Sequence, residues 1–443
     1  MRILCVLTLT FIVSTQSAGL AADPIHLQAD DDHRWYKGNM HTHSLWSDGD
    51  DYPEMIACWY RDHDYQFLVY TDHNVLLQGE RWIDVEKNED GKQAFEKLLA
   101  KFPNDWVETR IEDERQKVRL KKFDEIFDHL ALPQTFLLIQ GEEISDRFGK
   151  APIHLCATNT TRLLPPIGGD SIFDVMQRNI SAATSHRERT GEATLVHLNH
   201  PNFSYAITAE DLMHVVGENF FEVYNGHPAV HNSGNKLHAS TERMWDIINT
   251  WRLARLDLPL MYGLGTDDGH NYHEPGPAKG AQPGRGWVMV LAETLTPEAL
   301  VESLEAGRFY ASSGVVVKSV MANSKQLTVE VEPQQGITYQ IDFIGTRHGF
   351  DDTSTSATDD PEKADRITRR YSDDVGDVFQ SVTGTLATYE FTGDEIYVRA
   401  LVTSSCPHPN PAESGEFERA WVQPLQPGTE RQVRSAAPDP GQR

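Results

Sequence analysis

Histidines and carboxylates occur along the sequence in short groups that are suited to metal binding. The first group is His41-Thr42-His43, with Asp48 shortly after it. Two histidines at positions i and i+2 of a strand point to the same side, so both can reach one metal ion while Asp48 approaches from the next loop. Imidazole and carboxylate ligands suit zinc, iron or manganese. A His-x-His pair alone, however, is equally compatible with surface histidines.

Five further groups of the same kind follow along the chain. They are Thr71-Asp72-His73-Asn74, Gly141-Glu142-Glu143, His154, His197-Leu198-Asn199-His200 and Gly265-Thr266-Asp267-Asp268-Gly269-His270. Any single residue here could be structural or a helix cap. The joint pattern favours a metal centre, because each group lies at or near the end of a strand-length apolar run.

These runs predict the elements that must position the site. They are rich in β-branched and aromatic residues and span 35–40, 67–70, 136–140, 153–157, 194–198, 220–224, 260–264 and 287–291. Helical patterns lie between them at 53–62, 108–130, 171–187, 209–216, 241–256 and 296–306. Strands that alternate with helices predict a parallel α/β sheet. Polar residues at the carboxyl ends of the strands favour a barrel, because barrel enzymes build their sites there.

The pattern changes near Ser312. Strand-like segments without helices follow at 315–322, 326–332, 338–345, 385–391, 395–403 and 418–424, and predict a small β-sandwich-like domain. The segment 349–377, rich in Asp, Ser and Thr, is predicted to be a surface loop. We therefore expect a catalytic domain at 23–311, an all-β domain at 312–426 and a disordered tail at 427–443.

The first residues are typical of a secretory signal peptide. Arg2 is followed by an apolar stretch at 3–13 and by small residues up to Ala21 and Ala22, so we expect residues 1–22 to be removed on export to the periplasm or the extracellular space. The stretch is too short to span a bilayer as a helix. Cys58, Cys156 and Cys406 would remain, and their surroundings predict buried free thiols rather than disulfides.

The chain is strongly acidic, with a formal net charge of −26. Such a surface repels phosphate backbones and anionic lipids, which disfavours nucleic-acid binding and membrane binding. It would also repel an anionic small-molecule substrate, unless metal ions reverse the field locally. The oligomeric state is left open by the sequence.

Five of the motifs, taken in order, resemble the PHP (polymerase and histidinol phosphatase) superfamily of metal-dependent hydrolases. The matching segments are HTHSLWSDG, YTDHN, GEEIS with the following His154, NHP and TDDGH. The resemblance implies a distorted (β/α)7 barrel, here followed by the β domain of an exported member. It also implies two or three divalent metal ions (zinc, manganese or iron) held by His41, His43, Asp48, His73, Glu143, His154, His200, Asp268 and His270.

Within that set, the family pattern selects Glu143 over Glu142 and Asp268 over Asp267. Glu143 or Asp268 would bridge metals, and we expect Glu143, Asp268 and His270 to be the catalytic members. Asp72, Asp267 and Asn74 are then candidates for orienting the histidines, or else simple loop caps.

The chemistry of such a centre is hydrolysis by a metal-activated hydroxide that attacks phosphorus or a carbonyl carbon. We expect a phosphoesterase that acts on a small phosphorylated compound. The alternatives are a hydrolase of non-phosphate esters, amides or carbamates, and a secreted binding protein that uses its β domain. Arg147 and Lys150, in the loop after Glu143, could bind the substrate phosphate or simply be solvated. Asn225, in the segment EVYNG after the sixth strand, is a further candidate for substrate binding.

Overall fold

The structure is a computed structural model that describes residues 25–86, 89–273, 280–360, 362–363 and 366–428. The expected signal peptide, and the expected tail from residue 429 onward, lie outside the described residues. Among the described helices, none has the length and apolar character needed to span a membrane.

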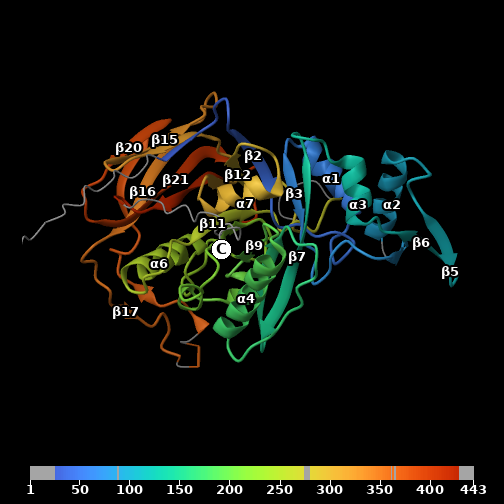
Figure 1. Cartoon of the computed structure of the whole chain (residues 1–443). Coiled ribbons are helices and arrows are strands. Elements are labelled where there is room, and N and C mark those ends of the chain that lie inside the picture. The colour runs from blue at the N-terminus through green and yellow to red at the C-terminus, as the bar shows by residue number, and fades with distance from the viewer. Residues whose placement is uncertain (1–24, 87–88, 274–279, 361, 364–365, 429–443) are drawn as a thin grey trace, which may run out of the picture.

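The chain folds as a mixed α/β protein around one sheet of 13 strands. Seven neighbouring strands of this sheet form an arc that carries the site (Figure 1). In sheet order they are β2 (Arg34–Asn39), β3 (Phe67–Tyr70), β7 (Leu137–Phe148), β8 (Ala151–Thr158), β9 (Leu195–Leu198), β10 (Phe220–Asn225) and β11 (Tyr262–Thr266). Thr42 after β2 forms a parallel bridge with Gly269 after β11, so the two ends of the arc meet at the site.

The arc is not wholly parallel, which corrects the sequence-based expectation. β2, β3 and β7 run parallel, as do β9, β10 and β11. β8, however, is antiparallel to both of its neighbours, β7 and β9. The physical reason is the connection: β7 and β8 are joined by Gly149 and Lys150 alone, with Gly149 at φ 59°, and so short a turn has no room for a crossover helix.

Most helices lie where the sequence predicts them. They are α1 (Pro53–Asp62), α4 (Ile172–Thr190), α5 (Ala209–Leu212), α6 (Thr241–Ala254) and α7 (Pro297–Glu305). α7 begins with a proline, and the side chain of Thr296 caps it by accepting a hydrogen bond from the backbone N–H of Ala299. α2 (Glu89–Lys101) lies where no element was predicted.

The helix predicted at 108–130 is wrong over most of its length. The segment forms the hairpin β5 (Thr109–Glu112) and β6 (Arg115–Arg119), and only α3 (Phe123–Leu130) is helical. With β4 (Trp82–Asp84) the hairpin makes a three-stranded sheet at one side of the molecule (Figure 1). Asp113 and Glu114 form its turn, with φ values of 50° and 63°, which is the mirror-image turn that fits the twist of a hairpin.

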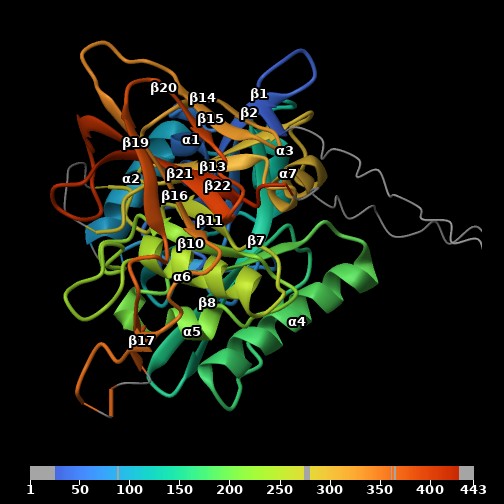
Figure 2. The same cartoon turned by 90° about the vertical axis from the view of Figure 1, so that its left-hand side faces the viewer.

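The C-terminal part is strand-rich, as expected, but it is continuous with the large sheet (Figure 2). Beyond β2 the sheet continues through β12 (Trp287–Ala292), β13 (Phe309–Ser312), β22 (Phe417–Leu425), β21 (Glu395–Pro407), β16 (Tyr339–Arg347) and β19 (Asp377–Thr383). A second sheet contains β1 (Ile25–Gln28), β14 (Val317–Ala322), β15 (Gln326–Val331) and β20 (Leu386–Glu390). The first strand of the described chain therefore joins three strands of the C-terminal part in this second sheet.

The segment predicted as a surface loop at 349–377 has structure of its own. It contains the short pair β17 (Ser354–Thr355) and β18 (Arg370–Tyr371), and it buries Ile367 and Val375. Arg243 on α6 donates hydrogen bonds to the carbonyls of Tyr371, Ser372 and Val375. The segment is thus fastened onto α6.

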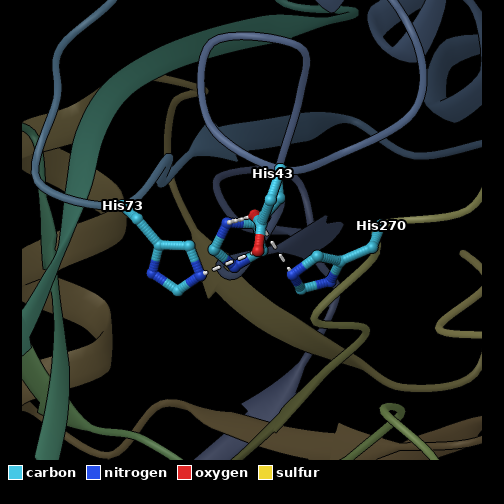
Figure 3. A group of neighbouring side chains, drawn as sticks. His43, His73 and His270 are labelled. Carbon is cyan, nitrogen blue, oxygen red and sulfur yellow. Dashed lines mark ion pairs between the residues drawn. The ribbon is translucent and has the colours of Figure 1, made fainter. Parts of the chain in front are cut away.

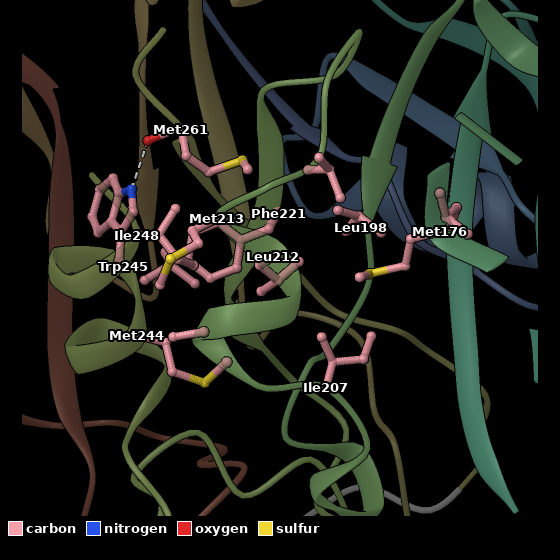
Figure 4. Packing of buried hydrophobic residues seen from close by; sticks show 14 of the residues in the cluster. Met176, Leu198, Ile207, Leu212, Met213, Phe221, Met244, Trp245, Ile248 and Met261 are labelled. Carbon is pink, nitrogen blue, oxygen red and sulfur yellow. Dashed lines mark hydrogen bonds between the residues drawn. The ribbon is translucent and has the colours of Figure 1, made fainter. Parts of the chain in front are cut away.

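The largest apolar core packs α4, α5 and α6 against the arc (Figure 4). Met176 on α4, Leu212 on α5, Met244 on α6 and Phe221 on β10 are fully buried in it. The indole N–H of Trp245 donates to the carbonyl of Met261 at 2.7 Å, which fixes α6 beside the start of β11. Two of the three cysteines, Cys58 and Cys156, are buried thiols as predicted, whereas Cys406 is partly exposed.

One buried ion pair joins α6 to the C-terminal strands. The guanidinium of Arg399 on β21 donates to both carboxylate oxygens of Asp246 on α6, each at 2.7 Å. The hydroxyl of Tyr397 adds a third hydrogen bond to Asp246 at 2.8 Å. A buried pair of this geometry is costly to break, so it couples the two parts of the chain.

Candidate metal centre

The arc strands and the segments that follow them bring all the predicted ligand residues into one cluster. β2 leads to His41 and His43, β3 to His73, β9 to His200, and β11 to Asp268 and His270, while Glu143 and His154 lie within β7 and β8. Asp48 approaches from the loop after β2. Each member of this set lies within ion-pair distance of another member.

Glu143 is the centre of the cluster. It is fully buried, and five imidazoles surround its carboxylate. Oε1 lies 3.4 Å from His41 Nε2, 3.1 Å from His154 Nδ1 and 3.4 Å from His200 Nε2, and Oε2 lies 3.6 Å from His43 Nε2 and 2.5 Å from His73 Nδ1. One carboxylate therefore faces five histidines that four strands position (β2, β3, β8 and β9), which is an arrangement suited to a ligand shared between metal ions.

Asp268 is the second buried carboxylate of the cluster. Its Oδ1 lies 3.3 Å from His41 Nε2, 3.2 Å from His43 Nε2 and 3.6 Å from His270 Nδ1. Its backbone has a φ of 49°, an uncommon conformation for a residue other than glycine, and such positions gather at functional sites.

The neighbouring acids, Glu142 and Asp267, point away from the cluster. Glu142 accepts a hydrogen bond from the backbone N–H of Leu164. Asp267 accepts from the hydroxyl of Tyr60 at 2.8 Å and from the N–H of Arg285 at 2.7 Å. In each of the two adjacent pairs, Glu142/Glu143 and Asp267/Asp268, only the second acid thus faces the histidines.

Asp48 and three histidines form the part of the cluster that lies nearest to solvent. Asp48, whose side chain is 58% exposed, lies 3.7 Å from His43 Nδ1, 3.5 Å from His73 Nε2 and 3.5 Å from His270 Nε2. Figure 3 shows these three imidazoles converging from separate segments. The loop that carries Asp48 is held by Asp72, which accepts from the hydroxyl of Ser47 at 2.6 Å. A substrate can reach the cluster from this side.

Several buried ring nitrogens of the cluster lack a hydrogen-bond partner among the described residues. They are His41 Nε2, His43 Nε2 and His154 Nδ1, and all three face Glu143. An unpaired buried polar atom costs free energy, and bound metal ions would supply these nitrogens with partners. The donor atoms fall into five groups whose members lie within 4.8 Å of one another. Four consist of residues of this cluster, namely His43-Asp48-His73-His270, His41-His43-Glu143, His41-His200-Asp268 and His73-Glu143-His154, and the fifth is His41-Cys156-His197. The residues present therefore fit divalent metal ions with nitrogen and oxygen ligands.

The charges of the cluster support the same reading. Burial would raise the pKa of Glu143, but the imidazoles of His154, His73 and His41 lower it well below its usual value. Burial would lower the pKa of His73, yet Glu143 and Asp48 raise it to about 11. The carboxylates thus remain anionic and attract positive charge, so protons and metal ions compete for the same imidazoles.

Glu222 on β10 is a member of the site whose role the sequence does not reveal. Its fully buried carboxylate accepts a hydrogen bond from His41 Nδ1 at 2.7 Å and from the backbone N–H of His200 at 2.7 Å. A carboxylate on the far nitrogen of a metal-binding histidine fixes the tautomer and the ring orientation. The available indication in the sequence is the acid itself, because a glutamate in the middle of an apolar strand is seldom buried without a partner.

Asn225 lies behind the cluster instead of facing the solvent. It is fully buried, and its side-chain amide donates to Glu222 at 2.8 Å and to Asp268 at 3.2 Å. Ser145 on β7 is also part of the site, since its hydroxyl lies 2.5 Å from His73 Nδ1. Asn74 holds Ser145 in place through two hydrogen bonds to its backbone.

Arg147 and Lys150 lie at the outer end of the β7–β8 hairpin and are exposed. Both line an open pocket of about 620 Å³. Ser145 and His154 line the same pocket and also contact the cluster, so the pocket and the cluster are continuous.

Comparisons with known proteins give limited help. No protein-family model matches the chain, and a comparison with curated proteins finds no match. Among solved structures, the chain is similar to a two-domain protein from Bacteroides vulgatus ATCC 8482, described as containing a predicted PHP-like metal-dependent phosphoesterase. The identity is 14%, the match covers 89% of this chain and 96% of the other, and the TM-score is 0.38.

Two further solved structures are similar over a smaller part of this chain. A protein from Bifidobacterium adolescentis ATCC 15703, provisionally named a metal-dependent phosphoesterase, has 13% identity over 55% of this chain and 92% of its own, with a TM-score of 0.28. PsfC from Pseudomonas syringae PB-5123 has 12% identity over 58% of this chain and 82% of its own, with a TM-score of 0.29. At such low TM-scores the likeness assigns neither a family nor an activity to this chain.

Proposed function

We propose that this protein is a metal-dependent hydrolase, and more specifically a phosphoesterase that acts on a small phosphorylated compound. The observation that carries the proposal is the convergence of unpaired, buried imidazole nitrogens on two buried carboxylates. Two or three ions would be held by the overlapping groups described above, and Glu143 belongs to two of these groups. When bound, such ions lower the pKa of water and stabilise the charge that develops on a phosphoryl oxygen.

The residues of the chain then divide into two roles. Glu143 and Asp268 would supply the negative charge that holds the ions together, and His270, beside the exposed Asp48, would lie nearest to the entering substrate. Glu222 and Asn225 would orient His41 and Asp268 from behind. Asn225 is thus proposed as a positioning residue, in place of the substrate contact expected from the sequence.

Three further expectations are kept as part of this proposal. The seven-strand arc would be a distorted (β/α)7 barrel of the PHP superfamily, divided at residue 311 from a sandwich-like β domain. The protein would be exported after loss of residues 1–22. The ions would be zinc, manganese or iron, two or three per chain.

Elemental analysis and a substrate panel test the proposal together. Protein kept free of chelators should contain two or three equivalents of metal per chain and should hydrolyse simple phosphate esters such as phenyl phosphate. Glu143→Gln should lose both metal and activity. Glu142→Gln is the matched control, because it changes the adjacent buried acid, which faces Leu164 and not the cluster.

Two results would overturn the proposal. One is less than one equivalent of metal in several preparations. The other is hydrolysis of carboxyl esters, amides or carbamates without any hydrolysis of phosphate esters, which would keep the hydrolase but reject the phosphoesterase.

A further inference from the structure

The β7–β8 hairpin extends the metal cluster outward. Side chains two residues apart on a strand share a face, so Glu143, Ser145 and Arg147 on β7 point the same way. Glu143 is the centre of the cluster, and Ser145 contacts His73. Arg147 comes next, in the pocket that Lys150 also lines. This face of β7 therefore extends from the buried carboxylate of Glu143 to the pocket that the two exposed cations line.

These two cations are without a side-chain partner in the part of the chain that the structure describes. Within the described ranges, neither the guanidinium of Arg147 nor the ammonium of Lys150 makes an ion pair or a side-chain hydrogen bond. The adjacent carboxylate, Asp146, also lines the pocket, but its hydrogen bonds go to other groups than these two side chains. It accepts from the backbone N–H groups of Arg147 and Gly168, each at 2.8 Å, and from the side-chain amide of Asn179 at 2.9 Å. The chain has 66 acidic and 40 basic residues, so the charge of these two cations beside the site is opposite to the net charge of the protein.

The spacing of the strand gives the reach of this pocket. Two residues along a strand advance about 7 Å, so the backbone of Arg147 lies roughly that far beyond Ser145. Arginine binds carboxylate and phosphate through paired hydrogen bonds, and lysine adds a point charge. The two side chains can therefore hold an anion that is separate from a phosphate on the metal cluster.

We propose that Arg147 and Lys150 form a subsite for a second anionic group, so that the substrate is a phosphate ester whose leaving group carries a carboxylate or another phosphate. This inference rests on the proposed phosphoesterase function. The acidic surface of the protein would repel a doubly anionic substrate, and the two local cations would counter this repulsion.

A matched pair of substrates tests the subsite. Phenyl phosphate has one anionic group, and 4-carboxyphenyl phosphate adds a carboxylate on the far side of the same ring. The wild-type protein should prefer the second substrate by about tenfold in kcat/KM, which corresponds to a modest pair of charged contacts. Arg147→Ala/Lys150→Ala should abolish this preference by raising the KM for 4-carboxyphenyl phosphate to the level of the KM for phenyl phosphate.

The control variant removes the same charge elsewhere. Arg34 and Lys325 are exposed and make no ion pair in the part of the chain that the structure describes. Arg34 begins β2 and Lys325 lies between β14 and β15, both away from the carboxyl ends of the arc. Arg34→Ala/Lys325→Ala should keep the preference for 4-carboxyphenyl phosphate.

A binding measurement separates the two proposals. Calorimetry with phenylphosphonate and 4-phosphonobenzoate, which cannot be hydrolysed, reports the subsite without turnover. Tighter binding of 4-phosphonobenzoate that Arg147→Ala/Lys150→Ala removes supports the subsite, even if no phosphate ester is hydrolysed and the phosphoesterase proposal fails. Equal binding of both phosphonates, or a preference that survives in the double variant, overturns the subsite whatever the activity.

Discussion

Glu222→Gln is the sharpest test of how the site is organised. The substitution keeps the size of the side chain and removes its charge. Glu222 is fully buried and accepts four hydrogen bonds. The donors are His41 Nδ1 at 2.7 Å, the N–H of His200 at 2.7 Å, the hydroxyl of Thr266 at 2.8 Å and the amide of Asn225 at 2.8 Å.

A glutamine cannot satisfy this set, because its NH₂ group donates where all four partners also donate. If the NH₂ faces His200, a backbone N–H that cannot reverse is left unpaired, at a cost of about 1–3 kcal/mol. If the NH₂ faces His41, the ring must move its proton to Nε2. That nitrogen faces Glu143 and Asp268, so the proton would block it as a metal ligand. Either way, we expect metal affinity or kcat/KM to fall by roughly 10- to 100-fold.

The assay is a metal competition with a chromogenic chelator, together with kcat/KM on phenyl phosphate and unfolding by urea. Thr266→Val is the control, since it removes one donor to Glu222 and leaves the carboxylate charge in place. It should cost less than Glu222→Gln in metal affinity. If Glu222→Gln matches the wild type within about twofold in affinity, turnover and stability, the orienting role of Glu222 is refuted.

Three further predictions follow from contacts elsewhere. Asp268→Asn should lose metal and activity with little loss of stability. Asp267→Asn should keep metal and lower the melting temperature, because Asp267 is hydrogen-bonded to Tyr60 and to the backbone. Metal analysis and calorimetry on both variants test this, and the same metal content and melting temperature in both would contradict it. Burial raises the pKa of Glu54 to about 7 from 4.5, so its ionisation opposes folding increasingly as the pH rises between these values and fully above 7. Glu54→Gln should therefore stabilise the protein by about 3 kcal/mol at pH 8 and by under about 1 kcal/mol at pH 5 in urea titrations, and a gain that is independent of pH would argue against it. Arg399→Leu should destabilise by about 3–5 kcal/mol, because it leaves Asp246 charged and buried, and scanning calorimetry should still give one transition; two separate transitions would mean that the two parts of the chain unfold independently.

The sequence predicts elements well where one local cause decides them. β3 matches its predicted range because it is a short, fully buried apolar run, and α1 matches because a proline opens it. The hairpin β5–β6 was missed since Asp113 and Glu114 form its turn without a glycine, and its charged residues imitate an amphipathic helix. The reversal of β8 was missed because a parallel neighbour and a hairpin partner have the same apolar pattern.

The same distinction applies to the site. Glu143 and Asp268 were separated from their neighbours Glu142 and Asp267 by the resemblance of the motifs, and the structure places only the first two among the histidines. The partner of His41 is different, because it lies 181 residues further along the chain. No local pattern contains that distance, and only the closing of the arc brings Glu222 to His41.

The pairing of strands from opposite ends of the chain also governs how the protein can fold. β2 pairs with β12, β13 pairs with β22, and β1 pairs with β14, so each of these edges waits for a partner made much later. Loops this long must close before their contacts stabilise anything, which makes folding slow and leaves strand edges exposed meanwhile. During synthesis, β1 would stay unpaired until β14 has emerged, one edge of β2 until β12 has emerged, and one edge of β13 until β22 has emerged. Exposed strand edges are templates for pairing with another chain, so this chain is most open to association with its own copies before its last strand is available.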